Sequence, residues 1–498
     1  MLQLALLLSC VHPTPAGPAP IDALQSLKGE VVTPVVGGKV VYAQATIRAG
    51  SAYDPTGQEG VASLTANLLR QGGTTDLGPE EVDAALYALA ADIDVIIDKE
   101  TVTFRGKALA EDADTFLPLF TSLVTQPAFD EAAFNRLRAD SIEHLTNGVM
   151  SSDELLGDML LDIWLHEGHP YGHPIQGRIG ALAALDLQDV EDFYNEAYVK
   201  SAVTVGLAAP GAESLATSFV AAFDGLGTTR PIEATPKPRP IVDDRRLLVV
   251  EKQTDSTGIH FGHPLEVDRN HEDYAALTLA MTAFGEHRQG HGRLFSVMRT
   301  ARGLNYGDYA YIEHYVQTGW SATRELSTSR VQNQFYVWIR PTSLENGPFA
   351  TKLALQLVEE LVADGLRQDE FNDIKAYMLR RMGLWAQEPG RRLGFEVDAV
   401  SMDHPNLLET LPAQIEALTL DGVNAAITTH ISTESMRFVV VTNDGDAFAR
   451  SLLEDSQTPI VYNGVQPDEE QAAVDTEVAS KHVEVDSWSV VAAEGIFR

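Results

Sequence analysis

Apolar and polar positions follow two periods along the chain, which separate the expected strands from the expected helices. Residues 40–49 alternate apolar and polar side chains, as a half-buried strand does. Apolar residues then recur with helical spacing at 60–70, and Pro79, followed by two acidic residues, marks the start of another helix. Two strands and a series of helices come next, and a strand near 202–207 closes the unit. This order predicts an α+β domain.

A second unit of similar length repeats this order. Strands are expected near 246–251, 257–262, 333–340 and 436–442. Phe134-Asn135-Arg136-Leu137 matches Phe371-Asn372-Asp373-Ile374 at an offset of 237 residues (371 minus 134), and 182–187 matches 415–420 at an offset of 233 (415 minus 182). We therefore expect an α+β fold of two homologous domains, each a mostly antiparallel sheet packed with helices.

Proline and charge mark the expected domain boundaries. Four prolines between 231 and 240 indicate an extended spacer, and acidic residues dominate the end of the chain. We expect a leader and tether at 1–30, a first domain at 31–228, a linker at 229–243, a second domain at 244–455 and a solvated acidic tail at 456–498, with a short strand near His482–Val485.

The composition is that of a soluble globular protein, since 44% of the 498 residues are hydrophobic and 21% are charged. This length exceeds what a single core supports, which agrees with two domains. The net charge of -35 opposes contact with phosphate backbones, so we expect no nucleic-acid partner. No stretch approaches the roughly 20 apolar residues of a membrane span.

The single cysteine, Cys10, lies in a short apolar leader. Leu7-Leu8-Ser9-Cys10 resembles the cleavage box of bacterial lipoproteins, which implies a lipidated Cys10 and a periplasmic or cell-envelope location, with membrane anchoring through the lipid. The apolar run has no Lys or Arg ahead of it. A secreted protein without the lipid, or a wrongly assigned start of the chain, is the alternative.

The stretch from Gly60 to Gly73 has the frame of a catalytic helix without its catalytic residues. It resembles the first active-site helix of the insulinase/pitrilysin metallopeptidases, close to G-L-A-H-F-L-E-H-M-L-F-x-G, in which two histidines bind zinc and the glutamate is the general base. The resemblance places Ser63 and Asn67 at the histidines and Ala66 at the glutamate. It therefore implies no zinc in this chain.

The third zinc ligand of that family is a glutamate about 75 residues further on. Glu143 lies 76 residues after Asn67 (143 minus 67) on a predicted helix, so the resemblance makes it the orphan ligand position. By itself, Glu143 is equally well interpreted as a solvated helix glutamate.

A replacement metal site has one candidate, His166, His169 and His173, because the sequence holds no intact H-x-x-E-H or H-E-x-x-H. Glycine and proline between these histidines break any helical register that would align them. The same stretch resembles the family's H-P-Y-G-x-P-x-x-G loop, with Gly177 in place, which has no metal role.

The second unit has a loop with Gly290 and Gly292, followed by Arg299 and Tyr306. This segment resembles the family's L-R-x-x-x-G-L-x-Y, whose Arg and Tyr contact substrate from the half opposite the zinc. A guanidinium and a phenol can hold peptide carbonyls and stabilise developing charge.

Some members of this family pair a zinc-bearing chain with a chain lacking the motif, and each chain forms one half of a clamshell around the substrate. The resemblance thus implies a non-catalytic, peptide-binding subunit with no cofactor of its own, whose partner subunit carries the zinc. A peptide-binding scaffold without hydrolysis and an active enzyme with metal at His166, His169 and His173 are the alternatives.

Overall fold

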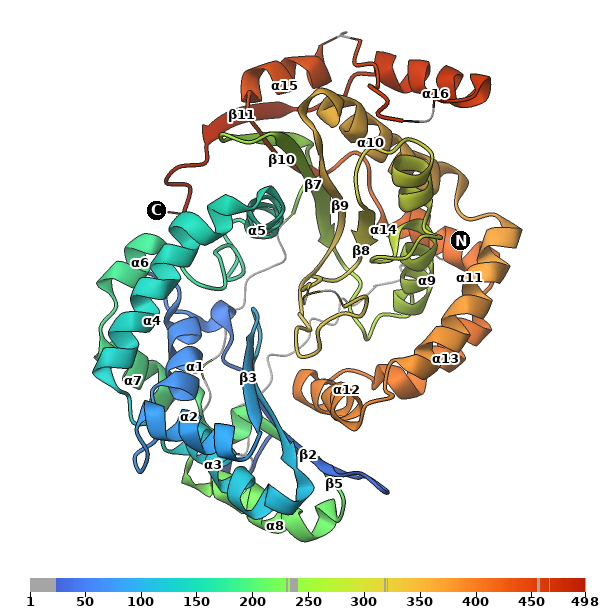
Figure 1. Cartoon of the computed structure of the whole chain (residues 1–498). Helices are drawn as coiled ribbons and strands as arrows, with labels where there is room; N and C mark the ends of the chain where they lie inside the picture. The colour runs from blue at the N-terminus through green and yellow to red at the C-terminus, as the bar shows by residue number, and fades with distance from the viewer. Residues whose placement is uncertain are drawn as a thin grey trace, which may run out of the picture.

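The first half of the chain builds a mixed sheet with the strand order β1-β5-β2-β4-β3 (Figure 1). The computed structural model describes residues 24–229, 232, 241–317, 319, 321–454, 457–464 and 466–497. The strands of this sheet are β1 (Gly29–Pro34), β2 (Val40–Ile47), β3 (Asp92–Ile97), β4 (Val102–Leu109) and β5 (Val203–Ala209). The helices of this half are α1 (Val61–Gln71), α2 (Pro79–Ala88), α3 (Ala113–Thr125), α4 (Glu131–Glu143), α5 (Asp153–Leu165), α6 (Ile179–Ala184), α7 (Leu187–Ala197) and α8 (Ala212–Ala221).

The second half builds a sheet with the order β11-β6-β10-β7-β9-β8. Its strands are β6 (Arg246–Glu251), β7 (Ser256–Leu265), β8 (Asp308–Tyr311), β9 (Asn333–Ser343), β10 (Arg437–Thr442) and β11 (Ser487–Ala492). Its helices are α9 (Tyr274–Gly285), α10 (Gly347–Asp364), α11 (Gln368–Arg381), α12 (Pro389–Met402), α13 (Leu407–Ala417), α14 (Leu420–His430), α15 (Gly445–Leu453) and α16 (Glu469–Ser480). The predicted strand at 246–251 is β6, residue for residue.

The two domains share one topology, which confirms the predicted repeat. In each domain the first strand pairs in parallel with the strand that follows the long helical segment (β1 with β5, β6 with β10), and the remaining strands of the shared order pair antiparallel. The matching segments lie in equivalent helices, α4 and α11, where Phe134 and Phe371 are both buried. Helices covering a largely antiparallel sheet in each half confirm the predicted α+β class.

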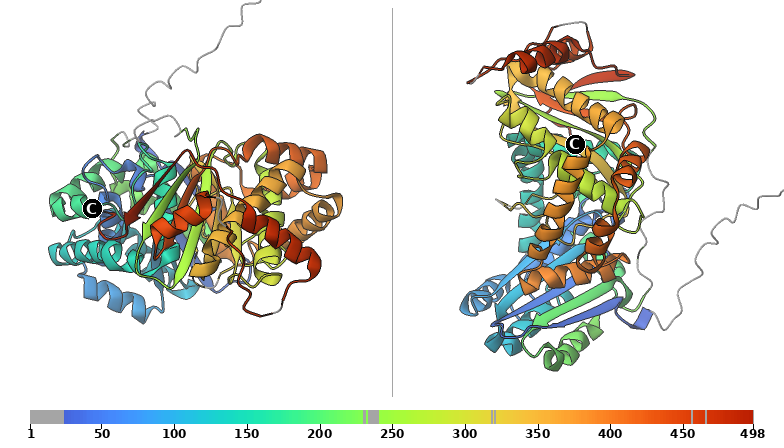
Figure 2. Two further views of the ribbon diagram at one scale, coloured as in Figure 1. Left: turned by 90° about the horizontal axis from the view of Figure 1, so that it is seen from above. Right: turned by 90° about the vertical axis from the view of Figure 1, so that its right-hand side faces the viewer.

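Each half contributes one helix to the sheet of the other half (Figures 1 and 2). Helix α5 packs on β7 and β10, and α12 packs on β2 and β5. Small residues permit both approaches: a Cβ at Gly157 of α5 would lie 2.4 Å from the His260 ring, and one at Gly206 of β5 would lie 2.4 Å from Val397 of α12. The two halves therefore pack as one body.

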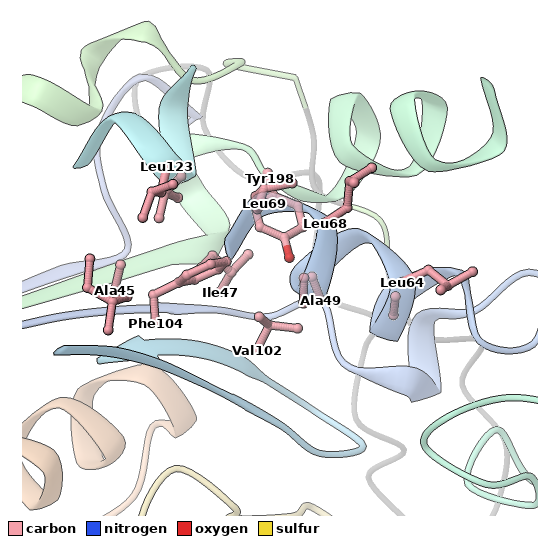
Figure 3. Packing of buried hydrophobic residues seen from close by; sticks show 14 of the residues in the cluster. Ala45, Ile47, Ala49, Leu64, Leu68, Leu69, Val102, Phe104, Leu123 and Tyr198 are labelled. Atoms are coloured by element: carbon pink, nitrogen blue, oxygen red, sulfur yellow. The ribbon is translucent and has the colours of Figure 1, made fainter. Parts of the chain in front are cut away.

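The apolar face of α1 forms part of the core of the first domain (Figure 3). Leu64, Leu68 and Leu69 are buried there together with Ile47 of β2 and Phe104 of β4. Truncating one such leucine costs about 2–5 kcal/mol of folding stability. The helix with the degenerate motif is thus a main structural element of its domain.

The C-terminal segment differs from the expected solvated tail. Strand β11 adds to the sheet edge in parallel with β6, pairing Ser487 with Arg246, and Asp475 of α16 forms a buried ion pair with Arg302 at 2.7 Å. The strand expected near His482–Val485 is wrong by a few residues, because the apolar residues that pair with β6 follow it.

Two sequence expectations lie outside the described residues: the leader with Cys10, and the four prolines of the linker. Within the ranges that the structure describes, no helix has the length and apolar character needed to cross a bilayer.

Candidate functional site

Helix α1 begins at a sharp bend that a buried carboxylate holds in place. Gly60 has a left-handed backbone with φ of 110°, a conformation that favours glycine. The Asp54 carboxylate accepts hydrogen bonds from the backbone N–H groups of Gly60 at 2.7 Å and Ala62 at 2.8 Å. These bonds satisfy donors that a helix start leaves unpaired. The helix that carries the degenerate motif is therefore held at its N-terminus by specific hydrogen bonds.

The residues at the three catalytic positions of that helix cannot bind zinc or act as a general base. Ser63 and Ala66 are buried, with 4% and 0% of their surface exposed. The Asn67 side-chain amide donates to the backbone carbonyl of Ser63 at 2.9 Å, within its own helix. Zinc sites in proteins use imidazole, thiolate or carboxylate ligands, and Ser63, Ala66 and Asn67 provide none of them.

Glu143 is the last residue of α4, a helix that packs beside α1. Its side chain is exposed and accepts a hydrogen bond from Asn147 at 3.2 Å. The fold thus brings the helix of the expected third ligand next to the degenerate motif. Glu143 itself faces solvent, as its alternative interpretation as a solvated glutamate requires.

The H-P-Y-G loop supports α1 through close backbone contact. Gly177 has φ of 101°, and a Cβ there would lie 2.2 Å from the Glu59 carbonyl oxygen and 2.5 Å from Gly60 Cα. The buried Lys99 ammonium donates to the backbone carbonyls of Tyr171, at 2.9 Å, and His173. These contacts give the loop a structural role.

The three histidines of this loop do not converge on a common point. His166 Nδ1 donates to the Asp162 carbonyl at 2.8 Å, and His173 Nδ1 donates to the Pro174 carbonyl at 2.9 Å. His169 Nδ1 accepts the Tyr171 N–H at 3.2 Å. Within the described ranges, these histidines do not form a set of ligand atoms within 4.8 Å of one another. The geometry therefore gives no support to a metal centre at this loop.

The glycine loop of the second domain packs closely against the end of α9. A Cβ at Gly292 would lie 3.3 Å from Gly285 Cα, whereas Gly290 is exposed at the surface. The chain then forms a π-helical turn at Phe295–Thr300. This turn carries Arg299.

Arg299 and Tyr306 form a stacked pair at the surface. The Arg299 guanidinium lies 4.6 Å from the centroid of the Phe295 ring and 5.9 Å from that of the Tyr306 ring. Tyr306 is 77% exposed, which is high for a tyrosine. The guanidinium thus makes cation–π contacts with both rings, and the exposed Tyr306 ring is accessible to a ligand. The fold thus brings together the two residues that the sequence pattern pairs.

A buried acid lies close to this pair. Burial raises the pKa of Asp308 to about 8, while a hydrogen bond from Asn305 and the charge of Arg299 act in the opposite direction. One carboxyl oxygen of Asp308 is buried without a hydrogen-bond partner in the described structure. A neutral Asp308 at neutral pH leaves the positive charge of Arg299 uncompensated by this acid.

Sequence reasoning missed the polar network between the two halves. Arg330, in the loop before β9, contacts Asp98 after β3 at 2.8 Å and Asp162 of α5 at 2.6 Å. All three side chains are nearly or fully buried. They come from three distant segments with no motif spacing, so the sequence offered no signal for them.

A second feature without a sequence signal is a cavity of about 150 Å³ between α9 and the ends of α11 and α12. Aromatic residues, among them Tyr311, Trp385 and Phe395, line it together with Glu286 and Arg391. All of its lining residues belong to the second half of the chain.

Comparison with known proteins gives matches along most of the chain. Residues 31–175 match the family model Insulinase (Peptidase family M16), and residues 184–378 match Peptidase M16 inactive domain. The Helicobacter pylori protein called non-peptidase homolog YmxG is 22% identical over 399 residues, 80% of this chain and 87% of that protein.

Solved structures agree. The peptidase M16 inactive domain from Pseudomonas fluorescens superposes with a TM-score of 0.73 at 21% identity, over 84% of this chain and 96% of that chain. The periplasmic protease PqqL from Escherichia coli gives a TM-score of 0.65 at 12% identity, over 92% of this chain and 50% of that one. At these identities the superpositions establish the fold.

Proposed function

Since the chain belongs to the insulinase (M16) peptidase family, we propose that it is the non-catalytic, substrate-binding subunit of a heterodimeric zinc peptidase. Its partner is a chain of the same family with an intact H-x-x-E-H helix and the zinc. The present chain supplies Arg299 and Tyr306 to the partner's active site. The substrate is a peptide, which the two subunits enclose.

The single observation that carries this proposal is the contrast between the two halves. The first half keeps α1 as a packed helix with Ser63, Ala66 and Asn67 at the catalytic positions. The second half holds the Arg299 guanidinium stacked and the Tyr306 ring exposed. A chain with these two candidate substrate-contact groups, and with no metal ligands at the catalytic positions of α1, suits a subunit that assists a second chain.

The chemistry of the pair supports a role in peptide hydrolysis. A guanidinium and a phenol donate hydrogen bonds to carbonyl oxygens, and a fixed positive charge stabilises the oxyanion that forms when water attacks the scissile carbonyl. The exposed Gly290, which has no side chain, allows its loop to approach a peptide backbone closely, whereas Gly292 packs against the end of α9.

The cell envelope is the proposed location. The lipoprotein-like Leu7-Leu8-Ser9-Cys10 supports export and a lipid anchor on Cys10, and the structural neighbour PqqL is named as a periplasmic protease. Metabolic labelling with a palmitate analogue tests the anchor. Label that persists in a Cys10→Ala variant would exclude it.

Reconstitution with a zinc-bearing family chain from the same organism tests the proposal. We expect peptide cleavage by the pair and none by this chain alone. Arg299→Ala should lower kcat of the pair about 100-fold, the usual effect of removing one oxyanion donor. Arg392→Ala is the matched control, because the Arg392 side chain is 60% exposed and pairs with Glu396 one turn along the same helix.

The alternatives give different results in the same assay. A scaffold that binds peptides without hydrolysis predicts equal activity for Arg299→Ala and Arg392→Ala, with both variants folded by thermal unfolding. Cleavage by the isolated chain would refute the subunit role. Loss of that cleavage in His166→Ala and His173→Ala would point to an enzyme with its own metal.

A further inference from the structure

We propose that the second domain binds a transition-metal ion, with zinc as the reference, through His271, Asp273 and His430. In the described part of the chain, this is where three potential metal-ligand side chains converge, with their ligand atoms within 4.8 Å of one another. The site lies outside the degenerate motif and apart from Arg299 and Tyr306. It is independent of the proposed function.

The fold assembles this site from two distant segments. His271 and Asp273 lie on the turn that leads into α9, and Asp273 is the residue before that helix. His430 is the last residue of α14, which packs against α9 (Figure 1). The helix pair therefore fixes the relative positions of the three side chains across 157 residues of sequence.

The distances are close to those of a coordination sphere. His430 Nε2 lies 2.8 Å from Asp273 Oδ2, and His271 Nδ1 lies 3.9 Å from the same oxygen. A tetrahedral zinc ion with bonds near 2.1 Å holds its ligand atoms about 3.4 Å apart. The two distances to Asp273 Oδ2 lie on either side of this value, and all three ligand atoms lie within 4.8 Å of one another.

The two imidazoles are arranged around the carboxylate. Their planes cross at 88°, with ring centroids 5.1 Å apart. Binding replaces the His430–Asp273 hydrogen bond and the 3.0 Å hydrogen bond that His271 Nδ1 accepts from the Asp273 N–H. An ion that coordinates all three atoms compensates for both losses.

The ligand set indicates the class of ion. Two imidazoles and one carboxylate suit zinc and its first-row neighbours, whereas magnesium and calcium prefer sites made of oxygens. The side chains of His271 and Asp273 are 32% and 35% exposed, and that of His430 is 12% exposed. The ion therefore has a path from solvent, and water completes its coordination.

Such an ion would cross-link the start of α9 to the end of α14. Helix α9 ends at Gly285, directly before the glycine loop. The proposed site is thus at the opposite end of the helix from that loop, about 18 Å away at 1.5 Å per residue. Its role is to stabilise the second domain.

Titration of the chelator-stripped, full-length chain with Zn²⁺ alone tests the site. We expect one ion per chain and a higher Tm with zinc. His271→Gln and His430→Gln should each weaken binding at least tenfold and remove the Tm shift. His144→Gln, at an exposed histidine of the first domain, is the control and should bind zinc normally.

Circular dichroism in the absence of metal verifies that the variants fold. Equal zinc affinity in the wild type and the His271→Gln/His430→Gln double variant would overturn this inference. That double variant also separates the two proposals. If the double variant retains stoichiometric zinc and also cleaves peptides, the non-catalytic role is wrong. If the wild type binds no zinc, only the metal site described here is refuted.

Discussion

Arg330 offers the sharpest test of how the two halves hold together. Its guanidinium is 1% exposed and contacts Asp98, which is fully buried, and Asp162, which is 7% exposed. Burial alone would raise the pKa of Asp162, but the charges of Arg330 and then Lys99 hold it well below its usual range. Arg330→Met removes the main positive charge and leaves two carboxylates inside the protein.

The expected cost follows from this geometry. Removing one partner of a buried ion pair typically costs 3–5 kcal/mol, roughly, because the other charge is left uncompensated. Lys99 Nζ remains 3.7 Å from Asp162 and compensates part of that charge. Asp98 keeps a hydrogen bond from the Lys99 backbone N–H at 2.6 Å but loses its ion-pair partner, so we expect a loss of about 3 kcal/mol, at the low end of that range, in the free energy of unfolding.

Urea unfolding followed by tryptophan fluorescence measures this loss. In the double variant Arg330→Met/Asp98→Asn the uncompensated charge is gone, so it should be more stable than Arg330→Met alone. Arg136→Met is the control, since its exposed pair with Asp140 contributes at most about 1 kcal/mol. Strictly additive effects of the two substitutions, or a loss below about 1 kcal/mol for Arg330→Met, would refute the reasoning.

Three further outcomes are expected. Gly177→Ala should cost about 1–3 kcal/mol because the new Cβ meets the Glu59 carbonyl, whereas Gly180→Ala, in helix α6 with open space around it, should keep or raise Tm; equal Tm values for the two variants would contradict this packing. Truncation before β11 should lower Tm and promote aggregation, measured by light scattering, because the edge of β6 becomes unpaired; a monodisperse truncated protein would contradict it. Because burial raises the pKa of Asp308 to about 8, above its unfolded value near 3.9, the wild type loses stability relative to Asp308→Asn as pH rises towards 8, by up to about 1.4 kcal/mol per pH unit; a constant difference between pH 5 and 8, by urea unfolding, would contradict the buried acid.

The sequence predicts elements well where local pattern decides them. The strand expected at 246–251 has the same bounds as β6, and the matched helices around Phe134 and Phe371 lie in equivalent positions. The periodicity of α5 and α12 predicts helices but does not indicate which sheet each one covers. That choice depends on small residues such as Gly157 and Gly206, which matter only once the two halves meet.

The functional residues also include some that the sequence pattern predicts and others that only the fold brings together. Arg299 and Tyr306 lie seven residues apart, so the pattern could pair them, and the stacked geometry agrees. Arg330 has its partners 232 and 168 residues away. Only the assembled fold brings these charges together, and the same holds for His430 and Asp273.

The degenerate helix also has a physical explanation. Position 66 is fully buried and position 63 nearly so. A glutamate at 66 without zinc would be a buried charge with no partner, and such a charge costs several kcal/mol or shifts its pKa until it is neutral. Small residues at these positions avoid that cost, while Leu64 and Leu68 keep the helix packed in the core. The helix can therefore lose its metal chemistry and still hold the domain that positions the second half.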